Sequence, residues 1–495
     1  DDNLGVASID TVNNTIALKH AHMFGMIPTD TTDEWGGRIV GYYAYNLLEE
    51  IDMPGEYFID RKNGTLYLYP PEGFESSSIA LSSMDEPLMA IENTSNLTIS
   101  GITFENTRGM GIYLEGSNNI KFENCTFRNL GTVAAMFGKG VSGADYPIHE
   151  FTGFLKSRTI GNLKAHNYEN TEFYNHAGTN CGLVNCSIYN TGTGAVILSG
   201  GNRTDLTAGN NYVKNCEMFD FNRWNKTYCA GVTLYGVGNH ISNCYIHHAP
   251  HQGIAIFGNE HLIEKNHLEK LVMDVHDNGA IYIGRNPSER GNIIRHNYFS
   301  EMGQEGFKNC AIHLEDGASG TLVEVNIFYK ASKFDFGHIL INGGNDNTIR
   351  NNVFIDGSHV LWIEDPNMAL PVETFNARYG IGGLIGKRLY NDIDITSQAW
   401  QEEYPDFKAY DADEIPLVVQ GNEFYNNFIS ADQFIVSKHS LDESVFARYE
   451  NNYFVKEGED TQFIDGKGNL AVDTLDLSEY IPEFKPIPVD GIGLK

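Results

Sequence analysis

The chain has 495 residues and a formal net charge of -31, because 65 Asp and Glu outnumber 34 Lys and Arg. This charge argues against nucleic acid as a partner, since phosphate binding requires clustered basic side chains. No apolar run approaches the roughly 18 residues of a membrane span, so we expect no membrane-spanning helix.

The start of the chain and its cysteines add two expectations. Asp1 is not followed by the charged and apolar regions of a signal peptide, so we expect a mature or trimmed form. The seven cysteines include no CxxC pair, which argues against a zinc ribbon or a redox motif. Their odd number leaves at least one free thiol.

Residues 1–85 are predicted to form a mixed β segment that packs on the rest of the protein. Within it, PGEYFIDRKNGTLYLYPP (54–71) has strand-like residues on both sides of Asn63-Gly64. Because Asn-Gly is a strong signal for a tight turn between two strands, we expect a β-hairpin here.

Residues 86–365 repeat a short pattern, apolar-x-x-[Cys/Asn]-x-apolar, with steps of 22 to 31 residues between Cys186 and Asn352. Its β-branched and aromatic segments, separated by Gly and Asn, predict strands and turns, and a repeat of this length predicts a solenoid. We therefore predict an all-β fold, a right-handed parallel β-helix with three strands per coil. The fourth position of the pattern forms one column: Ile102, Cys125, Cys186, Cys216, Cys244, Asn266, Asn297, Asn326, Asn352, Asn422 and Asn452.

Stacking explains the residues of this column. Asn side chains about 4.8 Å apart can hydrogen-bond along a stack. The cysteines are interpreted as small buried apolar groups, with disulfides between adjacent coils as the alternative.

A second family of strands lies between these segments and is also expected to stack. Its members are GIYLEG (111–116), GAVILSG (194–200), GVTLYG (231–236), GIAIFG (253–258), GAIYIG (279–284), AIHLEDG (311–317), HILINGG (338–344) and VLWIED (360–365).

Three regions depart from the repeat. Residues 132–180 are predicted to form a long loop. Residues 366–415 include TSQAWQEEYPDFKAYDADEIP (396–416), which predicts short helices over one side. Residues 416–495 are predicted to complete the β-helix and to end in an extended strap.

Aligning GIAIFG, GAIYIG and AIHLEDG gathers chemically active side chains on one face. In this alignment His251 lies one coil below Asp277 and Lys308 one coil above it, while Arg285 lies below Asp316. Adjacent coils are about 5 Å apart, a separation that paired carboxylates use in glycoside hydrolysis. The face collects His251, His276, Asp277, Tyr282, Arg285, His313, Glu315 and Asp316, together with Asn342, Trp362 and Glu364.

Glycoside hydrolysis requires two carboxyl groups in different roles, one protonated and one ionised. Asp277 and Asp316 fall on adjacent coils, and the sequence leaves open whether Glu315 or Asp316 points into a groove. Plainer interpretations compete with this one, because Asp-Asn-Gly and Glu-Asp-Gly are ordinary turn sequences. Trp362 and Tyr282 could stack on a sugar, but aromatic residues in strands more often belong to the core.

Metal-binding signals are weak. HExxH is absent, HxH occurs only at His20-Ala21-His22, away from the predicted repeat, and no EF-hand-like loop is present. We therefore predict no metal and no other cofactor, with Ca²⁺ bound by acidic clusters as the alternative.

The segment HHAPHQGIAIFGNEHLIEKNHLEKLVMDVHDNGAIYIGR, followed by GNIIRHNYF, AIHLEDGASG, INGGNDNTIRNNVF and QAWQEEYPDF, resembles bacterial right-handed β-helix carbohydrate-active enzymes. It is most similar to the glycoside hydrolases of this fold, which include β-xylosidase, xylanase and α-L-fucosidase activities. LLEEIDMPGEYFIDRKNGTLYLYPP is similar to a β insertion that these proteins carry. The likeness spans roughly residues 35 to 490.

The resemblance implies a catalytic carboxylate in the D-x-G-A-I-Y motif, which matches Asp277. It implies a second in or near Y-L-D-D-G, which matches Asp316 in HLEDG, where Glu315 and His313 replace the family's first Asp and Tyr. Glu301 is a rival partner. The family usually has an opening coil before the point where this chain begins, so we expect that the sequence starts inside the full length.

The leading hypothesis is a secreted extracellular or periplasmic glycoside hydrolase that acts on a polysaccharide or its oligomers. Asp277 would be the nucleophile and Asp316 the acid/base, with Glu315 or Glu301 as alternates. A uronate-acting lyase or C5-epimerase is the first alternative, with His251, Tyr282 or Lys308 as base and Arg285 or Ca²⁺ as neutraliser. A non-catalytic carbohydrate-binding β-helix is the second. The oligomeric state, the sugar and the linkage stay open.

Overall fold

The computed structural model describes residues 4–20, 43–141, 155–161, 174–333, 336–365, 381–409, 418–437, 441–456, 463–465 and 467–495. They divide into two compact units, a smaller one within residues 2–82 and a larger one that begins at Ser83. No helix in these ranges has the length and apolar character needed to cross a membrane.

In its described residues, 4–20 and 43–82, the smaller unit contains two hairpins and two short 3-10 turns. The predicted hairpin is confirmed: β3 and β4 pair antiparallel, the Asp60 carboxylate accepts hydrogen bonds from the Lys62 and Asn63 amides at 3.0 and 3.1 Å, and Gly64 has a φ of +67°. The elements are β1 (Val6–Asp10), β2 (Thr15–Leu18), η1 (Leu48–Glu50), β3 (Tyr57–Asp60), β4 (Thr65–Leu68) and η2 (Phe74–Ser76).

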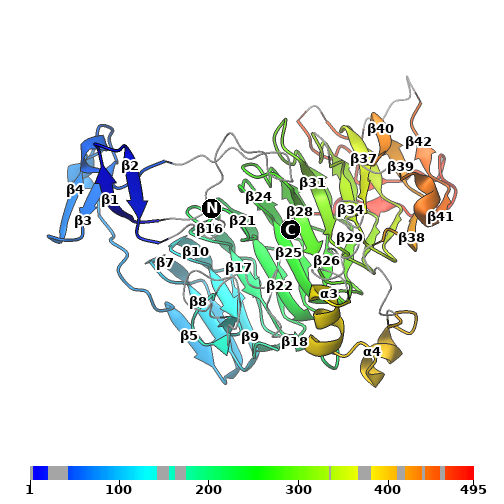
Figure 1. Ribbon diagram of the computed structural model, residues 1–495, viewed down its shortest axis with the longest axis horizontal. Helices are drawn as coiled ribbons and strands as arrows, with labels where there is room; N and C mark the ends of the chain where they lie inside the picture. The colour runs from blue at the N-terminus through cyan, green and yellow to red at the C-terminus, as the bar shows by residue number, and fades with distance from the viewer. Residues whose placement is uncertain are drawn as a thin grey trace. The chain divides into compact units, whose positions relative to one another are not determined.

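The larger unit is built from three long parallel sheets that the chain visits in turn, once per coil (Figure 1). Sheet 1 holds all of the predicted second strand family. It consists of β5 (Met89–Glu92), β8 (Ile112–Glu115), β11 (Ala135–Phe137), β17 (Val196–Leu198), β22 (Val232–Val237), β25 (Ile254–Asn259), β28 (Asn278–Gly284), β31 (Asn309–Glu315), β34 (Ile339–Asn342), β37 (His359–Glu364) and β40 (Gln433–Ser437).

Sheets 2 and 3 carry the shorter strands on the two sides of the Cys/Asn column. Sheet 2 consists of β6 (Ser95–Ser100), β9 (Ser117–Glu123), β14 (Gly178–Thr179), β15 (Gly182–Val184), β20 (Tyr212–Lys214), β23 (His240–Ser242), β26 (Leu262–Glu264), β29 (Ile293–Arg295), β32 (Leu322–Glu324), β35 (Thr348–Arg350), β38 (Asn422–Tyr425) and β41 (Phe446–Glu450). Sheet 3 consists of β7 (Thr103–Thr107), β10 (Thr126–Leu130), β16 (Ser187–Thr191), β21 (Glu217–Phe219), β24 (Tyr245–His247), β27 (His267–Glu269), β30 (Tyr298–Ser300), β33 (Ile327–Tyr329), β36 (Val353–Ile355), β39 (Phe428–Ser430) and β42 (Tyr453–Phe454).

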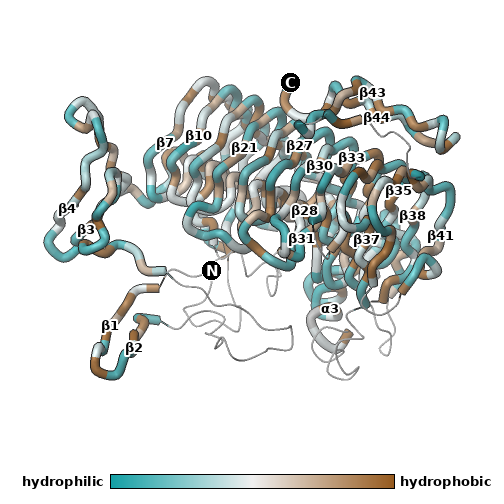
Figure 2. The backbone as a smooth tube through the Cα atoms, turned by 90° about the horizontal axis from the view of Figure 1, so that it is seen from above, coloured by the Kyte–Doolittle hydropathy of each residue, from teal (hydrophilic) through white to brown (hydrophobic). Residues whose placement is uncertain are grey.

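The predicted parallel β-helix is therefore confirmed. Along each strand alternate side chains point into the coil, and the stacked coils of Figure 2 show the resulting alternation of apolar and polar positions. Inward residues such as Ile281, Ile312 and Ile339 form one continuous buried core, while their neighbours in sequence face outward. This alternation decides which side chains of sheet 1 can build a site.

The predicted Cys/Asn column lies at the turn between sheets 2 and 3. The Asn297 side-chain oxygen accepts from the Asn266 amide group at 3.0 Å, and its nitrogen donates to the next oxygen, that of Asn326, also at 3.0 Å. All seven cysteines are buried and free, which supports the interpretation as small apolar groups over the disulfide alternative.

One position of the column was assigned wrongly. Asn352 bonds to Asn427 at 3.2 Å and Asn427 to Asn452 at 3.1 Å, so Asn427 occupies the place predicted for Asn422. The segment FYNNFI (424–429) fits the pattern one strand after VQGNEF, and the two segments cannot be told apart by the pattern alone.

Removing one rung of this ladder has a large expected cost. The change Asn297→Ala leaves the Asn266 amide group, the Ile263 carbonyl and the Asn326 side chain without their partner in a fully buried turn. We expect a loss on the order of 3 kcal/mol or more in the free energy of unfolding, measured by urea denaturation. The exposed Asn118→Ala is the control and should change stability little.

A second ladder, which the pattern did not reveal, lies at the turn between sheets 1 and 2. The Asn211 amide donates to Asn239 at 3.0 Å, the Asn239 amide to His261 Nδ1 at 3.0 Å, and the His261 amide to Asn292 at 3.1 Å. Asn422 belongs to this ladder, since its side chain accepts from the Asn347 amide at 2.9 Å. Its members vary in type, so no single letter marks the column.

His261 makes this ladder sensitive to acid. Its Nδ1 accepts a hydrogen bond and must stay unprotonated, and burial lowers the pKa of His261 from 6.5 to about 3. The lowered pKa stabilises the fold above pH 6.5, and this stability is lost as the pH falls towards 3. Lowering the pH from about 7.5 to about 5 should reduce the free energy of unfolding of the parent. We expect this reduction to be roughly 2 kcal/mol smaller in His261→Asn. Urea denaturation of both proteins at both pH values measures the difference. An equal loss in both proteins would contradict the assignment.

Interruptions of the repeat follow the prediction in part. The loop predicted at 132–180 is shorter than expected, because β11 joins sheet 1 and β14 joins sheet 2. Between these two strands, β12 (Gly140–Val141) pairs with β13 (Leu155–Lys156). Most of the remaining loop lies outside the described residues. The turn after β17 forms a small hairpin, β18 (Gly201–Asn202) with β19 (Thr207–Ala208).

The helical insertion and the strap are both present. The described part of 366–415 contains α3 (Leu384–Gly386), the π-helical turn η4 (Lys387–Asp392) and α4 (Gln398–Glu403). The C-terminal segment, with β43 (Thr474–Leu475) and β44 (Ile487–Pro488), packs apolar side chains on the outer face of sheet 3. Its last residue donates from Lys495 N to Asn215 at 2.7 Å, so the strap runs back over earlier coils.

Candidate active site

The candidate site lies on the outer face of sheet 1, on strands β28, β31, β34 and β37. Tyr282 is paired in register with His313, and Gly284 with Glu315. Their inward neighbours fill the core, so these residues alternate to the outside. The next two strands place Asn342 beside Glu364 and Leu340 beside Trp362.

Glu315 is the centre of this face. The Tyr282 hydroxyl donates to one carboxylate oxygen of Glu315, and Arg285 Nη2 lies 3.3 Å from the other. Gly284 makes the first contact possible, because a Cβ at this position would lie 2.9 Å from the Tyr282 hydroxyl and 3.0 Å from Glu315 Cβ. The Glu315 side chain is 13% exposed. Two donors, one of them cationic, thus hold the two oxygens of the Glu315 carboxylate.

Asp316 shares the same guanidinium. Arg285 Nη1 lies 2.8 Å from its carboxylate, as the sequence alignment predicted, and Asn342 donates to it at 3.1 Å. Burial raises the pKa of the Asp316 carboxyl above its usual range, with a further rise from the Glu315 carboxylate and an opposing effect of Arg285. Arg285 thus contacts Glu315 with one of its terminal nitrogens and Asp316 with the other, and Asn342 is the second partner of Asp316.

Asp277 is both a turn residue and a member of the site. It has a φ of +60°, and its amide donates to the Lys308 carbonyl at 2.8 Å, so Lys308 lies one coil above it as predicted. A carboxylate oxygen of Asp277, a ring nitrogen of His313 and a carboxylate oxygen of Glu315 all lie within 4.8 Å of one another. Asp277 is exposed, and its carboxylate accepts no hydrogen bond from the described residues.

His313, the third member of this cluster, is buried against two aromatic rings. It is 1% exposed, and its ring lies between those of Tyr282 and Phe336, each with centroids 5.7 Å away. A Cβ on Gly279 would lie 2.7 Å from His313 Cβ, so this glycine leaves the room that His313 needs. The Nδ1 atom of His313 is buried and has no partner among the described residues.

The predicted position of His251 is wrong by one residue. Ile254 pairs with Ile281, so His251 faces Asn278 instead of Asp277, and its Nε2 lies 3.3 Å from the Asn278 side chain. The alignment used the flanking glycines, whereas the inward isoleucines set the register. Asn278, which the sequence analysis missed, also accepts from Gln252 at 2.8 Å.

The other predicted residues separate into two groups. Trp362 donates to Glu364 at 3.2 Å and lies 5.9 Å from Phe336, so both belong to the site face, while exposed His276 stacks on Phe307 next to Asp277. Glu301 follows β30 in sheet 3 and lies 3.5 Å from Lys270. Glu301 is not part of the cluster formed by Asp277, His313 and Glu315.

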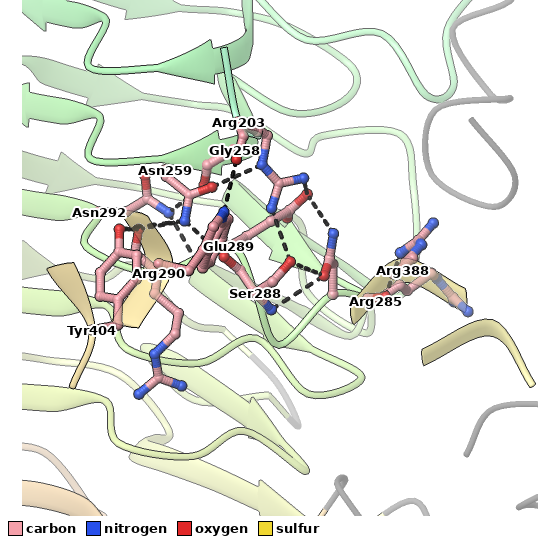
Figure 3. Close-up of polar contacts among 12 residues, drawn as sticks. Arg203, Gly258, Asn259, Arg285, Ser288, Glu289, Arg290, Asn292, Arg388 and Tyr404 are labelled. Atoms are coloured by element: carbon pink, nitrogen blue, oxygen red, sulfur yellow. Dashed lines mark hydrogen bonds and ion pairs between the residues drawn. The ribbon is translucent and has the colours of Figure 1, made fainter. Parts of the chain in front are cut away.

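A buried polar network, which no motif in the sequence indicated, fixes the loop that carries Arg285. Figure 3 shows Arg203, which donates to Asn259 at 2.7 Å and to Ser288 at 2.9 Å, with Glu289 3.9 Å away. Burial raises the pKa of the Glu289 carboxyl to about 7. From η4, Arg388 donates to the Arg285 carbonyl, so the helical insertion anchors this end of the site.

Comparisons with known proteins agree with the fold. The family described as "Right handed beta helix region" matches residues 88–224 and 230–376, more than half of the chain. Among curated proteins, none matches the sequence.

Similar solved structures share little sequence identity with this chain. XylC in complex with xylose is 13% identical, with 81% of this chain and 66% of that chain covered and a TM-score of 0.42. An alginate lyase of the PL6 family, AlyGC, is 13% identical, with 83% and 56% covered and a TM-score of 0.38. A protein described as a glycoside hydrolase is 14% identical, with 65% and 56% covered and a TM-score of 0.35.

The match thus spans a little over half of two of these proteins and 66% of XylC. The sequence match to the family covers both the strands of the site and most of the coils beneath them. This chain belongs to the right-handed β-helix family.

Proposed function

We propose that the protein is a glycoside hydrolase that uses Asp277 and Glu315 as its catalytic pair. The observation that carries the proposal is their separation, since carboxylate oxygens of the two residues lie within 4.8 Å of each other. Retaining glycosidases place their two carboxyl groups about 5 to 5.5 Å apart, whereas inverting enzymes need roughly 6.5 to 9.5 Å for a water molecule. The spacing therefore favours retention.

The surroundings of the two carboxylates suggest their roles. Glu315, whose two oxygens are held by Tyr282 and Arg285, would attack the anomeric carbon while the glycosidic C–O bond breaks. Exposed Asp277, which can exchange protons with solvent, would protonate the leaving oxygen. Asp277 would then take a proton from water, whose oxygen replaces Glu315 at the anomeric carbon and frees the sugar.

This proposal reassigns two of the predicted roles. Glu315, which the sequence left as an alternate, takes the part of the nucleophile, and Asp277 takes that of the acid/base. Asp316 becomes a positioning residue that holds Arg285, because its carboxylate is already engaged by Arg285 and Asn342.

The face beyond the pair suits a sugar. Half-buried Trp362 offers an aromatic surface next to Phe336, and sugar rings pack well on such surfaces. Asn342 and Glu364 lie side by side at the end of the neighbouring strands and could bind hydroxyl groups. These residues and His276 are the proposed substrate contacts.

A lyase or C5-epimerase fits this site less well. Such enzymes act on a uronate and need a positive group to neutralise its carboxylate. Arg285, a cation on the site face, already pairs with both Glu315 and Asp316. With Asp277 close by, a uronate carboxylate would face like charges, which raises its energy.

A panel of polysaccharides and nitrophenyl glycosides separates these functions. We expect new reducing ends without absorbance near about 235 nm, the signal of an unsaturated uronate. Products that absorb there would establish the lyase instead. Binding without any cleavage across the panel would favour a non-catalytic carbohydrate-binding protein.

A further inference from the structure

We propose that Asp277, His313 and Glu315 form a binding site for one divalent transition-metal ion, zinc in particular. We further infer that the bound ion blocks hydrolysis. Only this second statement rests on the proposed function. The metal site itself rests on three side chains that the register of β28 and β31 brings together.

The geometry is close to that of a three-ligand zinc site. One nitrogen and two carboxylate oxygens lie within 4.8 Å of one another. In a tetrahedral site with bonds of about 2.0 to 2.2 Å, ligand atoms are roughly 3.4 Å apart. To reach this spacing, the exposed Asp277 side chain would move towards His313 and Glu315, which are held on β31.

A second observation, an unpartnered nitrogen atom of His313, also favours a metal ion at this site. Its Nδ1 is buried and lacks a hydrogen-bond partner among the described residues, although the residue is only 1% exposed. Buried nitrogen atoms of this kind normally have a partner. Its ring packs against those of Tyr282 and Phe336, with centroids 5.7 Å away from each. A metal ion at the carboxylates would bind a ring nitrogen of this buried imidazole.

The ligand set selects among cations. Imidazole together with carboxylates suits zinc and its neighbours in the first transition row, whereas Ca²⁺ and Mg²⁺ prefer oxygen ligands alone. We therefore expect zinc to bind much more tightly than calcium. Because zinc would occupy the lone pairs of Glu315 and the proton-accepting oxygen of Asp277, neither group could act on a glycosidic bond.

The test is calorimetric titration of the EDTA-treated protein with zinc chloride. We expect one ion per chain, at least 100-fold weaker binding in His313→Gln and at least 10-fold weaker binding in Asp277→Asn. His240→Gln is the control, because this histidine lies on β23 beside Glu264 at 3.3 Å and should leave the affinity unchanged. Calcium chloride in place of zinc should produce no comparable binding.

Equal zinc affinity in the parent and both site variants, or no binding to the parent, would overturn the metal site. If His313→Gln does not fold, Asp277→Asn carries the test, because Asp277 is exposed. Zinc should also inhibit cleavage by the parent, with recovery on addition of EDTA, and activation by zinc would overturn the blocking role. The titration needs no substrate, so it stands even if the protein cleaves no glycoside.

Discussion

Glu315→Gln should abolish glycoside cleavage while leaving the fold intact. Glutamine keeps the shape of the side chain, and its one amide oxygen can accept from Arg285 while its amide nitrogen donates to the Tyr282 hydroxyl, but it cannot attack the anomeric carbon. We expect kcat/KM to fall by at least about 10³-fold, as for other removed nucleophiles. The measurement is initial rates on the best substrate of the panel, together with the melting temperature.

Two further variants serve as controls for Glu315→Gln. Glu301→Gln changes a carboxylate that pairs with Lys270 on another sheet, and its activity should equal that of the parent. Asp316→Asn removes the 2.8 Å ion pair to Arg285 and should cost roughly 10-fold, because it acts on Glu315 only through Arg285. A Glu315→Gln protein with more than a tenth of the parent rate would rule out the nucleophile.

Asp277→Asn should have the second large effect, and the size of that effect should depend on the leaving group. Loss of a general acid typically costs about 10² to 10⁴-fold, and the loss shrinks when the leaving group needs no protonation. We therefore expect a strong loss on oligosaccharides and a much weaker one on activated nitrophenyl glycosides, measured as kcat/KM for both.

The stability of the same variant tests the turn interpretation. Asp277 has a φ of +60° and is exposed, and asparagine tolerates this conformation well. The melting temperature should therefore stay within about 2 °C of that of the parent. A large loss of stability with full activity would mean that Asp277 serves the turn alone.

The sequence predicted the fold because the same physical requirement recurs in every coil. Inward positions must be apolar and buried turn amides need partners, so Asn297 and its counterparts repeat visibly. The second ladder escaped notice because Asn, His and Thr all occupy it. Asn422 was then assigned to the wrong ladder, since both turns near it carry asparagine.

The site was predicted in outline and missed in detail. The pairing of Arg285 with Asp316 and of Asp277 with Lys308 followed from aligning Ala280-Ile281 with Ala311-Ile312, which gives the observed register. His251 was misplaced because the inward isoleucines, not the glycines, fix the register between β25 and β28. The choice of Glu315 required the Tyr282 contact across Gly284, which depends on side-chain positions that no pattern encodes.

The central claim is tested most directly by trapping the covalent intermediate. After incubation with an activated 2-deoxy-2-fluoro glycoside of the sugar that the panel identifies, the intact protein should gain the mass of one glycosyl group. Peptide mass spectrometry should place that group on Glu315, and Glu315→Gln should stay unlabelled. A label on Asp277 or Asp316, or turnover with no trapped intermediate, would contradict the account.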